Sequence, residues 1–204
     1  MKNRFVLGLA SLGLAAVLFT SCSKVPQVEI DAANVAIEAA KTAQADVYVP
    51  EAFVALQDSM KAVMTEVEVQ GSKFFKNYKV AKANAISVTS LAGEVKLQSE
   101  NRIAELKVEI QTAITEVKTL LDANKALVLE APKGKEGASA LAAIKEELTT
   151  LDTAIVEANT LLETGELFAS LDKAKAAKEK ATAINVELTT VIEKYKANTK
   201  GRKR

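Results

Sequence analysis

Residues 103–127 read IAELKVEIQTAITEVKTLLDANKAL, and this stretch decides the fold. Its apolar residues recur at alternating intervals of three and four, which places them along one face of an α-helix. This alternation averages about 3.5 residues, the period of the seam in a left-handed coiled coil. The stretch therefore predicts a long amphipathic helix that packs along a partner. Its seam positions are Ile103, Leu106, Ile110, Ala113, Val117, Leu120, Asn124 and Leu127.

Four other segments carry the same spacing, namely 30–40, 53–67, 144–162 and 171–195. We therefore expect an all-α protein, an elongated antiparallel bundle of about five helices with coiled-coil-like heptad seams. The apolar stripe of the third helix extends back to Phe74, so this helix is expected to begin as early as residue 73. Its register changes between 88 and 103, near Gly93, which predicts a bend or phase change there.

The helix boundaries follow from turn residues. Pro50 is expected in the first turn of a helix, while Gly71 and Gly165 are expected at helix ends. The Pro- and Gly-containing segment that begins at Ala131 indicates a linker. The predicted organisation is a signal peptide at 1–21, a tether at 22–27, a three-helix region at 28–130, a linker at 131–139, a helical hairpin at 140–198 and a basic tail at 199–204.

The N-terminus has the pattern of an export signal. Two basic residues, Lys2 and Arg4, precede an apolar run at 5–19, and small residues follow it. Phe19-Thr20-Ser21-Cys22 resembles the lipobox of bacterial lipoproteins, in which the cysteine is lipidated after cleavage. The alternative is a retained membrane helix, but a run of 15 residues falls short of the roughly 20 needed to span a bilayer.

Composition limits the chemistry that the chain offers. The sequence has no His, and Cys22 is its only cysteine, so the usual neutral-pH base and a second thiol are missing. After cleavage, 25 basic residues would face 26 acidic ones, which argues against general nucleic-acid binding. The adjacent carboxylates Glu146 and Glu147 diverge on a helix and are interpreted as solvated charge, as is the basic stretch at 173–180. We expect no enzyme, no cofactor and no metal site.

The segment from Ala36 to Ala92 resembles an uncharacterised family of small all-helical bacterial envelope lipoproteins, a domain of unknown function. The resemblance rests on an Ala-rich helix, the turn Tyr48-Val49-Pro50, a second amphipathic helix and the Tyr78-Lys79-Val80-Ala81-Lys82 helix start. It implies a helical envelope lipoprotein, and it carries over no catalytic residue because the family has none assigned.

Two groups of residues are candidates for binding. The aromatic residues gather around two predicted turns and form either a small binding patch or an ordinary core cluster. The basic C-terminal residues could contact an anionic surface or remain solvated. The first group is Tyr48, Phe53, Phe74, Phe75 and Tyr78, and the second is Lys200, Arg202, Lys203 and Arg204.

We expect a lipid-anchored envelope protein that acts as a structural or adaptor module and docks protein partners through its long helices. The alternative is a periplasmic carrier that binds a lipid or peptide between its helices. In Bacteroidota-like lipoproteins, which the N-terminus resembles, acidic residues just after the cysteine mark export to the cell surface. Residues 23–26 contain none, so the resemblance implies the periplasmic face of the outer membrane.

Overall fold

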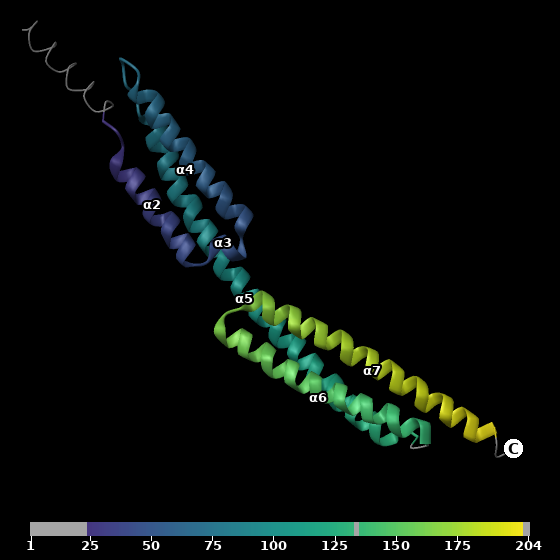
Figure 1. Cartoon of the computed structure of the whole chain (residues 1–204). Helices are drawn as coiled ribbons and strands as arrows, with labels where there is room; N and C mark the ends of the chain where they lie inside the picture. Colours follow the sequence, from purple (N-terminus) through teal and green to yellow (C-terminus); the bar gives the residue numbers. More distant parts are fainter. Residues whose placement is uncertain (1–23, 133–134, 202–204) are drawn as a thin grey trace, which may run out of the picture. The chain divides into compact units, whose positions relative to one another are not determined.

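The computed structural model describes residues 24–132 and 135–201, and this part of the chain is helical without any strand (Figure 1). The prediction of an all-α helical bundle is thus confirmed. The chain divides into two compact units, residues 1–102 and 103–204. The helices are α2 (Gln27–Thr42), α3 (Ala45–Tyr48), α4 (Pro50–Gly71), α5 (Lys79–Glu130), α6 (Lys135–Thr164) and α7 (Leu167–Gly201).

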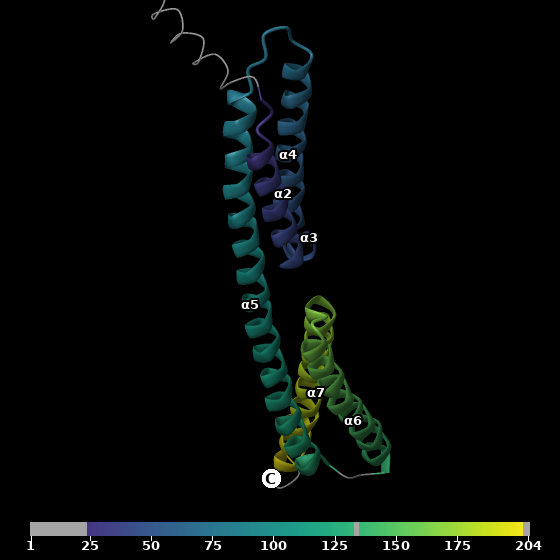
Figure 2. The ribbon, with the colours of Figure 1, turned by 90° about the vertical axis from the view of Figure 1, so that its left-hand side faces the viewer.

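The first unit contains α2, α3, α4 and the beginning of α5, which lie side by side (Figure 2). One apolar core joins residues from all of these helices. Many of its members are alanines without exposed surface, so the helix backbones approach closely. The core residues are Ile30, Ala33, Ala40, Ala45, Phe53, Leu56, Met60, Val63, Ala85, Val88, Ala92 and Val95.

Local sequence explains where the helices of this unit begin and end. Pro50 occupies the first turn of α4, where its missing N–H costs nothing, and Glu51 lies at the positive end of the helix. The end of α2 is less conventional, because Gln44 takes the left-handed conformation with φ of 59°. That conformation is strained for a residue with a Cβ atom, and it turns the chain sharply into α3.

The second unit contains the remainder of α5 together with α6 and α7. A short turn joins α6 to α7, and Gly165 supplies its positive φ of 86°. The backbone N–H of Glu166 donates to the carbonyl of Leu161 at 2.9 Å, which closes the end of α6. Each of these helices contributes to the buried apolar set, which includes Leu106, Ile110, Val117, Leu148, Leu151, Ala158, Ala181, Ile184 and Leu188.

Helix α5 corrects two expectations. It begins at Lys79 rather than near residue 73, and it continues without a break through Gly93. The buried positions keep their three–four spacing from Ala85 to Ser99, and the shift comes later. Beyond Val117, Leu121 and Val128 are buried in place of the predicted Leu120 and Leu127. An α-helix has about 3.6 residues per turn, so its buried face drifts away from a strict 3.5-residue repeat.

The segment between α5 and α6 is shorter than the linker expected at 131–139, because α6 begins at Lys135. The two C-terminal helices also do not stand alone as a hairpin. Asn124 on α5 donates a hydrogen bond to the carbonyl of Ala181 on α7, so α5 packs within the same unit.

Candidate functional site

The expected anchor lies outside the described residues. Cys22 precedes Lys24, where the description begins, and the basic residues Arg202, Lys203 and Arg204 follow its end. The side chain of Lys200 is likewise outside it. Among the described helices, none has an apolar stretch long enough to cross a bilayer.

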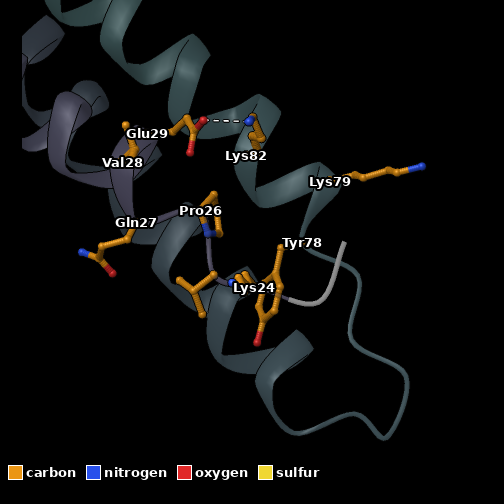
Figure 3. Close-up of a pocket in the computed structure, with 9 residues that line it drawn as sticks. Lys24, Pro26, Gln27, Val28, Glu29, Tyr78, Lys79 and Lys82 are labelled. Carbon is orange, nitrogen blue, oxygen red and sulfur yellow. Dashed lines mark ion pairs between the residues drawn. The ribbon is translucent and has the colours of Figure 1, made fainter. Parts of the chain in front are cut away.

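The N-terminal end of the first unit holds a surface pocket of about 370 Å³ (Figure 3). Its walls come from two separate parts of the chain, the segment that leads into α2 and the first residues of α5. Pro26 is buried here, so the expected tether already lies against the helices two residues after the description begins. The lining residues are Lys24, Val25, Pro26, Gln27, Val28, Glu29, Tyr78, Lys79 and Lys82.

An ion pair closes one side of this pocket. The Nζ atom of Lys82 lies 2.7 Å from Oε1 of Glu29 and joins α5 to α2. This hydrogen bond from Lys82 holds the pKa of the Glu29 carboxyl below its usual range. The lowered pKa favours a permanently charged carboxylate, not a proton-transferring group at neutral pH. In the part of the chain that the structure describes, no three His, Cys, Asp or Glu residues cluster as metal ligands.

The five aromatic candidates do not form one cluster. Tyr48, Phe53 and Tyr78 are buried, as expected of core residues. Phe74 and Phe75 are instead 91% and 85% exposed, in the loop between α4 and α5. Their rings contact each other edge to face, with centroids 5.0 Å apart. Tyr48 and Phe53 lie near the start of α4 and the other three follow its end, so the length of α4 separates them.

Three buried polar side chains join helices within the units. Ser99 Oγ donates to the carbonyl of Ala43 at 2.6 Å, and Ser170 Oγ donates to that of Ala158 at 2.7 Å. Asn124 donates from Nδ2 to the carbonyl of Ala181 at 2.8 Å. A polar residue in an apolar seam favours one helix register, because any slip would leave its donor unpaired. Of the three, only Asn124 was part of a predicted seam.

The basic stretch of α7 is paired across helices. Lys175 and Lys178 bind Glu109 and Glu116 of α5 at 2.8 Å and 2.7 Å. Lys173 pairs with Glu157 of α6. All of these groups are substantially exposed, so each pair contributes only about 0–1 kcal/mol. The sequence interpretation as a merely solvated face missed these partners, because they lie far away along the chain.

The described helices define the class of protein as an all-helical bundle. No protein-family profile, curated protein or solved structure matches the chain.

Proposed function

We propose that the protein is a lipid-anchored helical component of a bacterial envelope that acts as a structural or adaptor module. The signal-like pattern that ends at Cys22 supports the anchor. The turn at Tyr48–Pro50 supports membership of the small helical lipoprotein family, because it joins α3 to α4 as that pattern implies. The lack of acidic residues at 23–26 supports the periplasmic face of the outer membrane.

The closed interior of the first unit carries the adaptor proposal. Alanines with 0% exposure lie at the contacts of its helices and bring the backbones together. A carrier needs an interior space that a ligand can fill, typically hundreds of Å³ lined by apolar groups. These alanines leave outer surfaces, not the interior, for recognition. They are Ala33, Ala40, Ala45, Ala81, Ala85 and Ala92.

Several large apolar side chains on the outer helix faces support contact with protein partners. Val35 on α2 is 70% exposed, and Val156 on α6 is 64% exposed. Isolated apolar residues are normal on protein surfaces, so they are useful as probe positions and do not define an interface.

Site-specific crosslinking in intact cells tests the adaptor proposal. A photoreactive residue at Val35 or Val156 is expected to give discrete protein adducts, while one at buried Leu56 gives none. Cys22→Ser is expected to abolish labelling by a fatty-acid probe and to release the protein from membranes. Labelling that persists without Cys22 would refute the lipid anchor.

The alternative is a carrier for a lipid or peptide, and the pocket beside Glu29 and Lys82 offers it one binding site. Native mass spectrometry of the purified chain separates the two functions. A stoichiometric co-purified lipid, lost when Val28 is replaced by Asp, would favour the carrier. An unliganded mass with protein adducts in cells would favour the adaptor.

A further inference from the structure

The loop between α4 and α5 presents the two most exposed of the large apolar side chains in the described residues. Every residue from Ser72 to Asn77 is exposed, and Phe74 and Phe75 keep only small parts of their rings covered. Aromatic rings normally bury large areas in cores or at interfaces. Two neighbouring rings left in water therefore indicate a surface that becomes covered in use.

The loop is held at both ends, so the rings are presented from a fixed base. Tyr78 is only 5% exposed, and its hydroxyl would lie 3.6 Å from a Cβ atom built on Gly71. Asn77 Oδ1 accepts a hydrogen bond from the backbone N–H of Lys79 at 3.1 Å. At the other end, Ser72 Oγ donates to the carbonyl of Val69 at 2.8 Å.

The charged residues that neighbour the two rings in the sequence are basic. The sequence from 69 to 93 contains lysines and no acidic residue. Lys82 is paired with Glu29, while Lys73, Lys76 and Lys79 surround the rings along the chain. A basic rim around exposed aromatic rings matches an anionic surface with an apolar interior, which is the interface of a membrane with acidic lipids.

The loop lies at the same end of the first unit as the N-terminal segment. Tyr78 and Lys79 line one pocket with Lys24 and Val28 (Figure 3), and in Figure 2 the loop and the start of α2 are at one end of the unit. Val28 is 78% exposed and adds apolar surface there. A chain anchored just before Lys24 would hold this end against the bilayer.

We propose that Phe74 and Phe75 insert into the interface of an anionic membrane while Lys73, Lys76 and Lys79 contact its headgroups. This inference rests on the proposed function only for the N-terminal anchor. The loop would fix which end of the unit faces the lipid.

The absence of Trp from the sequence makes the test specific. Phe74→Trp in the full chain places one fluorophore at the loop. Val47→Trp is the matched control, because Val47 lies on α3 beside the start of α4, at the opposite end of that helix from the loop. Each protein is reconstituted into vesicles of equal parts phosphatidylglycerol and phosphatidylcholine. We expect a shift to shorter wavelength and at least about twofold stronger quenching by brominated acyl chains for Phe74→Trp than for Val47→Trp.

Each outcome decides the proposal. Equal quenching of the two variants, or no quenching of Phe74→Trp, overturns it. The proposal is also overturned if the emission of Phe74→Trp shifts in native membranes but is not quenched by brominated lipid in vesicles. In that case a protein partner, not lipid, covers the rings. Vesicles of phosphatidylcholine alone, or high salt, are expected to weaken the quenching of Phe74→Trp, and the same quenching in both lipids would refute the role of the lysines.

The loop and the lipid anchor can fail separately. Labelling of Cys22 by a fatty-acid probe, together with a water-exposed indole in Phe74→Trp, retains the anchor and overturns the loop. A quenched indole in a Phe74→Trp chain whose Cys22 is unlabelled supports the loop and refutes the anchor. In a chain that also carries Cys22→Ser, Phe74→Ser with Phe75→Ser is expected to keep its helical circular dichroism while losing the vesicle binding of Cys22→Ser alone, and retained vesicle binding by this variant would overturn the proposal.

Discussion

Replacing Gly93 by Ala is expected to stabilise the protein. Gly93 lies in the interior of α5, and its position is exposed. A Cβ atom built there meets no other atom within 4 Å, so the new methyl group introduces no clash. In an exposed helix interior, Ala is more favourable than Gly by about 0.8–1.0 kcal/mol, chiefly because the unfolded chain loses freedom. The expected gain in the free energy of unfolding is therefore about 1 kcal/mol.

Native-state hydrogen exchange measures this gain in the first unit alone. About 1 kcal/mol corresponds to roughly fivefold slower exchange of its slowest amides, provided that these open only by unfolding of the unit. For a unit of this size, the same energy raises the melting temperature by about 4–8 °C. Unchanged or faster exchange would refute this expectation.

Gly165→Ala is the matched control for this prediction. A Cβ atom at Gly165 also meets nothing within 4 Å, but φ is +86°. The same substitution is therefore expected to destabilise the second unit by about 1–2 kcal/mol, because left-handed backbone is costly for Ala. Both variants add a methyl group where no atom lies within 4 Å, but only Gly165 has a positive φ. Effects of the same sign on the free energy of unfolding would therefore contradict the reasoning.

Three further outcomes are expected. Asn124→Ala lowers the free energy of unfolding by about 1–3 kcal/mol in urea titrations, because it removes a buried hydrogen bond between α5 and α7. Asn185→Ala has a smaller effect, because the part-buried Asn185 only donates a hydrogen bond to the side-chain oxygen of Asn124. Lys82→Met raises the pKa of Glu29 toward the ordinary range of a glutamate carboxyl in an NMR titration, because the lowering hydrogen bond is lost. In the unaltered protein the Glu29–Lys82 stabilisation is complete at neutral pH and is lost as pH falls through the lowered pKa of Glu29, and an unchanged pKa in the variant would contradict this. Leu56→Ala, which empties a site with 0% exposure, costs about 2–5 kcal/mol in the same urea titrations, and a loss below about 1 kcal/mol would contradict the packing.

The sequence was sufficient to predict the helices, because three–four spacing is a local signal that one chain displays by itself. Ile103, Leu106 and Ile110 illustrate how well it works in the middle of α5, where two of the three are fully buried. It was less accurate farther on, where a one-residue drift buries Leu121 instead of Leu120. Such a drift depends on how the neighbouring helices wrap, which periodicity alone does not contain.

Hydrogen bonds and ion pairs between residues far apart in the chain could not be predicted from the sequence. Nothing near Ser99 in the chain indicates that its hydroxyl donates to Ala43, and nothing near Lys175 indicates Glu109. The aromatic candidates show the same limit. Tyr78 and Phe75 lie three residues apart, yet one is buried and the other exposed, because α5 begins only at Lys79. The expected helical stripe had placed Phe74, which is also exposed, on one face with Tyr78.

The division of the chain near Arg102 has a consequence for folding during synthesis. Each unit is made from one uninterrupted stretch of sequence, and the division falls inside α5. The first unit therefore has all its partners as soon as residue 102 has emerged. The rest of α5 must wait for α6 and α7, and Leu106, Ile110 and Val117 remain uncovered meanwhile. This half of α5 is the segment for which a chaperone that binds nascent apolar surface would have the longest opportunity.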